Sequence, residues 1–274
     1  MRGLVFDIGG TNTRVALVSA SGRLGKPVIF PTSKNGPKGV KKIAEEAKKM
    51  IGSGAISFAV GGLPKLIREG NLQGWIGHNI KSLLYKKLRC PIQLENDAAL
   101  AGLGEAHYGA GKGKSILAYI TASTGIGGVR IVDGEIDRST GGFEPGHHVI
   151  DAPLVLKRGP RSPGYWEKRI SGSALEKRFG KTPKEITDPK VWKEFREYFA
   201  LGLVNVSIFW SPETIVVGGS LLKHPQARLS DIRRLVKRYC YVFQGAPAIV
   251  RAKLGDIGGL YGALHIAKKQ FFKR

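Results

Sequence analysis

Cysteine and methionine are almost absent from this chain. Its 274 residues include two of each. Cys90 and Cys240 are too few and too far apart in the sequence for a disulfide framework or a cysteine-rich metal site. The simplest interpretation is a protein that stays reduced, and we therefore predict a cytoplasmic location.

Long hydrophobic runs are also missing. No stretch of about 18 consecutive apolar residues occurs, so we expect neither a transmembrane helix nor a membrane partner. The N-terminus reaches Asp7 too early for a secretory signal peptide. Hydrophobic residues make up 42% of the chain, which is typical of globular proteins, and the length suggests two domains.

Acidic residues are scarce relative to basic ones. The chain has 21 Asp and Glu against 44 Lys and Arg, a formal net charge of +23. One interpretation is a polyanionic partner such as nucleic acid or polyphosphate. The other is a basic, solvated surface with no specific partner. Because the basic residues are spread along the whole chain without a long basic arm, the pattern favours the second interpretation.

One unit occurs twice along the chain: an apolar strand, a turn rich in Gly and Thr, and a second strand. The two turns cover residues 7–13 and 121–128. The repeat indicates two related α/β domains that face each other with a ligand between them. We place the smaller domain at residues 1–110 and the larger at 111–259, and expect the last helix, at about 260–274, to pack back on the first domain.

Apolar spacing predicts the elements between the repeats. Helices are expected over residues 38–50, 80–88, 98–106 and 260–272. Strands are expected over residues 4–6, 14–18, 55–60, 91–94, 115–120 and 129–132.

Both Gly/Thr turns have the composition of a phosphate-binding turn. Glycine lets the backbone approach a phosphate closely, and turn N–H groups and Thr hydroxyls donate hydrogen bonds to its oxygens. The candidates are Gly9, Gly10, Thr11 and Thr13 in the first turn and Thr124, Gly125 and Gly127 in the second. Neither turn is a Walker A loop, because no Gly-Lys-Ser/Thr follows. For either turn alone, the alternative is a glycine-rich hairpin without a ligand.

Two further positions complete a candidate nucleotide site. Asp7, at the end of the first strand, has the chemistry to hold a magnesium ion through water. Gly218 and Gly219 follow an apolar strand and would let an adenosine lie flat on the backbone; an ordinary strand-to-helix turn is the alternative.

Asp97 is the candidate general base. It follows a predicted strand and precedes a predicted helix, so its carboxylate is held in place and open to a ligand. Phosphoryl transfer needs positioning and a group that accepts the hydroxyl proton. Asn96 can hydrogen-bond a sugar hydroxyl. The alternative for Asp97 is a helix cap.

Glu144 and His147 lie in a glycine-rich loop and offer polar groups to paired sugar hydroxyls. A Glu or His in a loop is more often simply solvated, and this alternative stays open on the residues alone.

Together, the order and spacing of these motifs resemble those of the ROK sugar kinases, the bacterial glucokinase type. Residues 71–75, Asn-Leu-Gln-Gly-Trp, are similar to the family's Asn-Leu-Pro-Gly-Trp sugar loop. Residues 144–147, Glu-Pro-Gly-His, are similar to its Glu-Ile-Gly-His. Residues 164–167 and 171–175 resemble its Gly-Cys-x-Glu and Ser-Gly-x-Ala-Leu motifs.

The resemblance implies a fold, a reaction and a set of site residues. The fold would be two actin-like (ribonuclease-H-like) ATPase domains with an interdomain cleft. The reaction would be ATP- and Mg²⁺-dependent phosphorylation of a hexose, with glucose at its 6-hydroxyl as the leading candidate. Asp97 would be the catalytic base, and Asp7, both Gly/Thr turns, Gly218 and Gly219 would hold the nucleotide. The sugar site would comprise Asn71, Asn96, Asp97, Glu144, His147 and Glu167. A homodimer is the candidate assembly.

The chain departs from the family pattern at a metal site. Many members carry a Cys-x-Cys-Gly-x-x-Gly-Cys zinc motif after the Gly-His. Because no cysteine lies between His147 and Glu167, the tetrahedral Cys₃His site cannot form, and we predict no zinc. His147 would then serve the sugar alone. Pro145 and His148 also replace more usual residues.

Three alternatives remain open on the sequence. Inorganic polyphosphate, rather than ATP, is a candidate donor because of the +23 charge. The acceptor is open among glucose, other hexoses and N-acetylhexosamines. A non-catalytic sugar-binding or nucleic-acid-binding module is the third alternative; the intact Asp97 and the two phosphate motifs disfavour it, and we expect no specific nucleic-acid partner.

Overall fold

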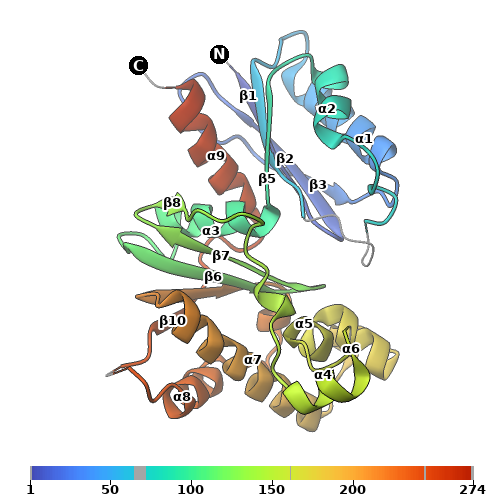
Figure 1. The fold of residues 1–274 in the computed structure, drawn as a ribbon. Helices are drawn as coiled ribbons and strands as arrows, with labels where there is room; N and C mark the ends of the chain where they lie inside the picture. The colour runs from blue at the N-terminus through green and yellow to red at the C-terminus, as the bar shows by residue number, and fades with distance from the viewer. Residues whose placement is uncertain (1, 65–71, 161, 244, 273–274) are drawn as a thin grey trace. The chain divides into compact units, whose positions relative to one another are not determined.

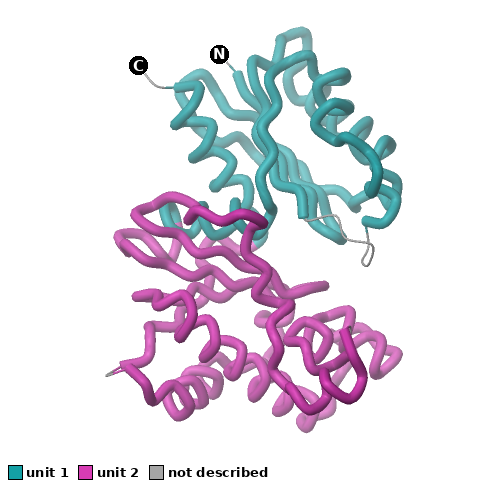
Figure 2. Tube along the Cα trace, in the orientation of Figure 1, with its two compact units in different colours: residues 1–108, 256–274 teal, residues 109–255 magenta. Residues whose placement is uncertain are grey.

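The computed structural model describes residues 2–64, 72–160, 162–243 and 245–272. The chain forms two compact units (Figure 2). Unit 1 comprises Met1–Tyr108 with Asp256–Arg274, and unit 2 comprises Gly109–Gly255. We predicted divisions after residues 110 and 259, whereas the structure divides after Tyr108 and Gly255.

Unit 1 contains a five-stranded sheet with the order β3-β2-β1-β4-β5. Its strands are β1 (Gly3–Ile8), β2 (Asn12–Val18), β3 (Val28–Pro31), β4 (Phe58–Gly62) and β5 (Ile92–Glu95). β1 pairs antiparallel with β2 and parallel with β4, and β4 pairs parallel with β5. The parallel strands β1, β4 and β5 therefore end at the same edge of the sheet.

Helices cover both faces of this sheet (Figure 1). They are α1 (Gly36–Ile51) and α2 (Ile80–Leu88) on one face and α3 (Asp97–Tyr108) and α9 (Gly258–Phe271) on the other. β1 has apolar side chains on both faces: Leu4 and Phe6 pack in the α1–α2 core, and Val5 packs against α9. A strand buried on both faces reads as a continuous apolar run, which is how it appears in the sequence.

Unit 2 repeats the sheet of unit 1. Its strands are β6 (Ile116–Ala122), β7 (Ile126–Val132), β8 (Glu135–Ile136), β9 (Thr214–Gly218) and β10 (Ala248–Arg251). Their order, β10-β9-β6-β7-β8, and the antiparallel pairing of β6 with β7 and parallel pairing with β9 match those of β1 to β5. The repeat of strand, turn and strand predicted from the sequence is thus one part of a repeated five-stranded sheet.

Four helices of unit 2 contribute side chains to a core with large aromatic residues: α5 (Trp166–Ile170), α6 (Gly172–Phe179), α7 (Pro189–Trp210) and α8 (Leu229–Tyr239). A further helix, α4 (Ala152–Arg158), buries none of its residues. Trp166, Trp192, Phe195 and Phe199 are fully buried in this core. Among the described residues, none of the helices combines the length and hydropathy needed to cross a bilayer.

Candidate active site

Asp7 is a buried carboxylate at the end of β1, and one of its oxygens lacks a partner. Oδ1 is inaccessible to solvent and has no hydrogen-bond partner, and Arg14 Nη1 lies 3.8 Å from Oδ2. Burial and the negative charge of Asp97 raise the pKa of Asp7 to about 7, although Arg14 opposes the shift. A buried carboxylate with an unsatisfied oxygen beside a second carboxylate is suited to a cation such as Mg²⁺.

Two glycines let the backbone approach Asp7 closely. A Cβ at Gly259, in the first turn of α9, would lie 2.8 Å from Asp7 Cγ. A Cβ at Gly62 would lie 3.0 Å from Asp7 Oδ1 and 3.1 Å from Asp97 Cα. Asp7 and Asp97 therefore flank the same glycine of β4, because Asp7 pairs with Gly62 in the sheet and Gly62 pairs with Glu95.

Asn96 and Asp97 have different roles at the start of α3. Asn96 Oδ1 accepts a hydrogen bond from Ala99 N at 3.0 Å, which is the side-chain bond of a helix cap. Asp97 is the first helical residue, and its Oδ1 accepts from Ala98 N at 2.9 Å. The alternative role considered for Asp97 was that of a helix cap; in the structure, Asn96 caps α3.

The first Gly/Thr turn is held by its own hydrogen bonds. Gly9 N donates to Asn12 O at 3.0 Å, and the Thr32 hydroxyl donates to Gly9 O at 2.8 Å. Thr13 is 2% exposed, and its hydroxyl lies 2.8 Å from that of Thr32. Thr11 is exposed, and Gly9 and Gly10 are partly exposed. The turn thus presents Gly9, Gly10 and Thr11 to solvent and buries Thr13 beneath them.

The second Gly/Thr turn brings three segments of unit 2 together. Gly172 N donates to Ser123 O at 2.7 Å, and Ser173 N donates to Thr124 O at 3.0 Å. Ser220 N, directly after Gly218 and Gly219, donates to Ser123 Oγ at 3.0 Å. Gly127 lies in β7 opposite Thr121. Our sequence analysis assigned no role to Ser123, Ser220 or the start of α6; the Ser-Gly-x-Ala-Leu resemblance at residues 171–175 was the available signal.

We expect Gly219→Ala to disrupt this turn. Gly219 has φ +100°, and a Cβ there would overlap the carbonyl oxygen of Ala122 in β6. The strained backbone and the overlap should cost about 3 kcal/mol of stability or more and remove nucleotide binding. Urea denaturation and nucleotide titration measure the two effects.

Gly180→Ala is the matched control. Gly180 also has a positive φ, +65°, but a Cβ there meets nothing within 4 Å. Its cost should be about 1 kcal/mol, with nucleotide binding retained. Equal losses of stability and nucleotide binding in the two variants would show that the close contact between Gly219 and β6 does not cause the effect.

Three predicted sugar-binding residues gather beside the second turn. Glu167 Oε2 accepts from Ile126 N at 2.8 Å, and a Cβ at Gly125 would lie 2.5 Å from the same oxygen. Glu144 Oε2 lies 3.6 Å from His147 Nδ1 in the 3-10 turn η1 (Pro145–His147). A Cβ at Gly146, in the middle of η1, would lie 3.2 Å from Glu167 Cβ. Glu144, His147 and Glu167 therefore lie close together in unit 2.

The remaining predicted sugar residues belong to unit 1. They are Asn96 and Asp97, described above, and Asn71, which lies outside the described residues. The end of the predicted sugar loop is well anchored, because Trp75 is fully buried and its Nε1 donates to Ser33 O at 2.8 Å.

His148 is a packing residue in this structure. Its ring stacks on Trp166 with centroids 4.9 Å apart, and burial lowers the pKa of His148 to about 4. The ring is therefore neutral at pH 7. In the described part of the chain, His, Cys, Asp and Glu side chains form no cluster of three or more that could hold a metal ion.

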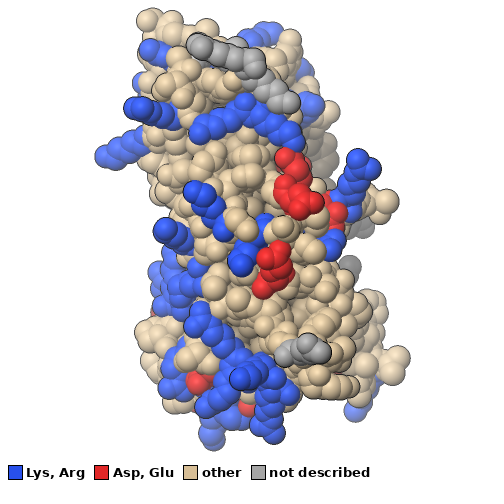
Figure 3. Space-filling model, turned by 90° about the vertical axis from the view of Figure 1, so that its left-hand side faces the viewer, with Lys and Arg blue, Asp and Glu red and all other residues tan. Residues whose placement is uncertain are grey.

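The excess positive charge is displayed on the surface. Lys and Arg far outnumber Asp and Glu on the face shown in Figure 3. On and before α8, the Arg228 and Arg234 side chains are 61% and 77% exposed, although both pair with Asp231.

Comparisons with known proteins agree with the resemblance seen in the sequence. The model of the ROK family matches residues 4–270. A fructokinase of Zymomonas mobilis is 30% identical over 285 residues, covering 94% of each chain. The ROK hexokinase of Thermus thermophilus is 29% identical, with a TM-score of 0.77 and coverage of 98% of this chain and 99% of that one. An inorganic polyphosphate/ATP-glucomannokinase from Arthrobacter is 26% identical, with a TM-score of 0.70 and coverage of 98% and 99%.

The likeness to these structures, together with the two five-stranded sheets, confirms the predicted fold class: a mixed α/β protein of the actin-like ATPase fold. It extends over nearly the whole of each chain compared, so both units are included.

Proposed function

Because the chain belongs to the ROK family and is a sugar kinase, we propose that it transfers the γ-phosphoryl group of ATP to a hexose, with the 6-hydroxyl of glucose as the preferred acceptor. The observation that carries the proposal is the pair of carboxylates, Asp7 and Asp97, on either side of Gly62. Phosphoryl transfer needs one group to hold the metal and another to take the hydroxyl proton. The two carboxylates supply both.

Asp97 acts as the general base. Its backbone is held at the junction of β5 and α3, and its Oδ1 is oriented by Ala98 N. In the proposed reaction, the carboxylate accepts the proton of the attacking sugar hydroxyl as the oxygen bonds to the γ-phosphorus and ADP leaves. The Asn96 side chain caps α3 through its oxygen, and its amide nitrogen would donate to the sugar.

Asp7 would hold the magnesium ion, directly or through water. The ion would neutralise charge on the nucleotide phosphates as the phosphoryl group moves. Because Asp7 Oδ1 has no hydrogen-bond partner, a cation bound to this oxygen would not have to displace an existing hydrogen bond.

The backbone turns would hold the nucleotide. Exposed groups of Gly9, Gly10 and Thr11 would bind phosphate oxygens, and Thr13 would support that turn from beneath. Thr124, Gly125 and Gly127 would do the same in the second turn, and Gly218 and Gly219 would receive the adenosine. Glu144, His147 and Glu167, with Asn71 and Asn96, would bind the sugar hydroxyls.

A sugar panel with coupled ADP detection tests the acceptor. The panel comprises glucose, mannose, fructose, allose and N-acetylhexosamines at fixed ATP and Mg²⁺. We expect glucose to give the highest kcat/KM, because hydroxyl-binding groups discriminate strongly between sugars that fit and sugars that leave them unpaired. No sugar-dependent ADP release with any member would refute kinase activity; another preferred hexose would refute only the choice of glucose.

Inorganic polyphosphate is a second candidate donor. The chain carries a net charge of +23, and a relative of known structure is a polyphosphate/ATP-glucomannokinase. ATP and polyphosphate should be compared at matched phosphate concentration. We expect ATP to be preferred at least tenfold in kcat/KM, since Gly218 and Gly219 would bind an adenosine that polyphosphate lacks. A preference for polyphosphate, lost on raising the salt concentration, would instead make the basic surface part of the donor site.

A further inference from the structure

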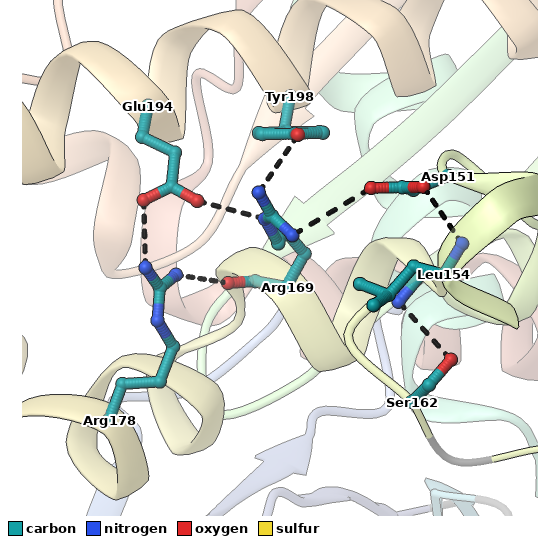
Figure 4. Close-up of polar contacts among 8 residues, drawn as sticks. Asp151, Leu154, Ser162, Arg169, Arg178, Glu194 and Tyr198 are labelled. Carbon is teal, nitrogen blue, oxygen red and sulfur yellow. Dashed lines mark hydrogen bonds and ion pairs between the residues drawn. The ribbon is translucent and has the colours of Figure 1, made fainter. Parts of the chain in front are cut away.

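Arg169 is the centre of a polar cluster that has no role in the proposed reaction (Figure 4). Its Nε donates to Glu194 Oε1 at 2.8 Å, and Nη2 donates to the Tyr198 hydroxyl at 2.9 Å. The guanidinium carbon also lies 4.3 Å from the centroid of the Tyr198 ring. Because Glu194 and Tyr198 both belong to α7, Arg169 ties the short helix α5 to the longest helix of unit 2.

The same guanidinium reaches the start of α4. Nη1 lies 4.0 Å from Asp151 Oδ2, and Asp151 Oδ1 accepts from Leu154 N at 3.1 Å as the cap of α4. One side chain therefore connects α4, α5 and α7. Only the planar fork of an arginine has enough donors in fixed directions to do this, and a lysine at the same position does not.

The segment that Arg169 connects to α7 lies between two predicted sugar-binding residues, His147 and Glu167. Trp166 N donates to His148 O at 3.1 Å and Ile150 N donates to Gly164 O at 2.8 Å, so backbone hydrogen bonds join the residues after His147 to those before Glu167. Glu167 lies two residues before Arg169 in α5, which has only five residues. A helix this short is not stable alone, so tertiary contacts set its orientation.

Trp166 and Arg169 join α5 to α7. Trp166 is fully buried, and its Nε1 donates to Tyr198 O at 2.9 Å. Arg169 makes the contacts of the polar cluster described above. Burial raises the pKa of Glu194, but the hydrogen bonds and charges of Arg178 and Arg169 outweigh it and hold the pKa below its usual value. Glu194 is therefore ionised at neutral pH, and the cluster is held by charge-assisted hydrogen bonds in a partly buried setting.

We propose that Arg169 is a positioning residue for the sugar site. It holds α5 in the orientation in which Glu167 Oε2 accepts from Ile126 N, beside η1 with Glu144 and His147. The inference rests on the proposed function, because it takes Glu167 and His147 as groups that bind the sugar. A residue that acts through Glu167 should affect sugar binding and leave the nucleotide turns unchanged.

The test compares Arg169→Ala and Arg169→Lys with Arg178→Ala. Arg178 is the matched control: it donates to Glu194 Oε2 at 2.8 Å and to the backbone oxygen of Arg169 at 3.1 Å, whereas the contacts with Asp151 and Tyr198 belong to the Arg169 side chain (Figure 4). We expect Arg169→Ala to raise the KM for sugar about tenfold or more, with the KM for ATP within about twofold of wild type. Arg169→Lys should show a smaller rise of about threefold to fivefold, because it keeps the charge and loses the fork. Arg178→Ala should change neither KM by more than about twofold.

Hydrogen–deuterium exchange of the sugar-free proteins tests the same idea without activity. Amides of residues 148–160 and 162–167 should exchange about fivefold faster or more in Arg169→Ala and at the wild-type rate in Arg178→Ala. If Arg169→Ala does not fold, Tyr198→Phe takes its place, with a smaller increase expected in sugar KM and in exchange.

Several results would overturn the inference. They are an unchanged sugar KM and exchange rate in the Arg169 variant, a parallel rise in the KM for ATP, or an equal effect of Arg178→Ala. A wild-type protein without sugar-dependent ADP release would defeat the proposed function, and the exchange data would then still decide whether Arg169 holds residues 148–160 and 162–167.

Discussion

Replacing Asp97 by Asn should lower kcat by about a hundredfold or more and leave sugar affinity within about threefold of wild type. Asn has the shape of Asp and keeps an oxygen that can accept from Ala98 N, so the start of α3 is preserved. It cannot accept the proton of the attacking hydroxyl, and the loss of a general base typically costs this much. Steady-state kinetics give kcat, and calorimetric sugar titration gives the affinity.

Glu95→Gln is the matched control for Asp97→Asn. Glu95 lies two residues before Asp97 and also carries a carboxylate. Its Oε1 accepts a hydrogen bond from Asn96 N at 2.8 Å, and a Gln side chain can accept the same bond. We expect kcat within about threefold of wild type for this variant. Near-wild-type turnover in Asp97→Asn would remove Asp97 from the role of base, and equal losses in both variants would point to a disturbed α3 instead.

Replacing Asp7 by Asn should have two opposite effects: kcat falls by about a hundredfold or more, and the ligand-free protein becomes more stable at pH 8. The loss of activity follows from the loss of the proposed magnesium ligand. The gain in stability follows from the pKa of Asp7, which is about 7 in the folded protein against an ordinary value of 3.8.

The pH dependence follows from the sign of that shift. Between about pH 4 and pH 7, folded Asp7 retains a proton that the unfolded chain has released, so this group lowers the free energy of unfolding as the pH rises. Above pH 7 the penalty is complete and amounts to about 4 kcal/mol, since each pKa unit corresponds to about 1.4 kcal/mol. Asn is neutral at every pH and avoids this penalty, so the two proteins should differ most at pH 8 and little at pH 4.

Urea denaturation without Mg²⁺ at pH 4, 6 and 8 measures this difference. Asp97→Asn serves as a cross-check, because removing the charge of Asp97 takes away one cause of the shift and should stabilise the protein at pH 8 by a smaller amount. If Asp7→Asn were less stable than the wild type at pH 8, the Asp7 carboxylate could not be a destabilising charge in the ligand-free protein. Its Oδ1 would then have to be well paired.

The sequence predicted the helices of unit 1, whereas it predicted none of the helices α4 to α8 of unit 2. The expected helices match α1, α2, α3 and α9 to within a few residues. α1 and α2 bury one face and expose the other, whereas α3 is a mostly buried helix that is rich in small residues. The longest helix that we did not predict is α7, Pro189–Trp210. Its start carries a recognisable signal, Asp188 before Pro189, but ten of its residues are buried, so its apolar pattern is less clearly one-sided.

The sequence by itself determined which chemistry is present: two Gly/Thr turns in a repeated unit, and a carboxylate at each of two strand ends. These are local properties, since turn composition and the polarity of a strand end depend on neighbouring residues alone. Only the tertiary structure decided how each group is used. It raised the pKa of Asp7 through burial and through Asp97, buried Thr13 with its hydroxyl against that of Thr32, and gave the helix cap to Asn96. It also joined Ser123 to Ser220 and Arg169 to Asp151 and Glu194. Most of these effects depend on distances between residues far apart in the chain, which packing sets and local sequence does not.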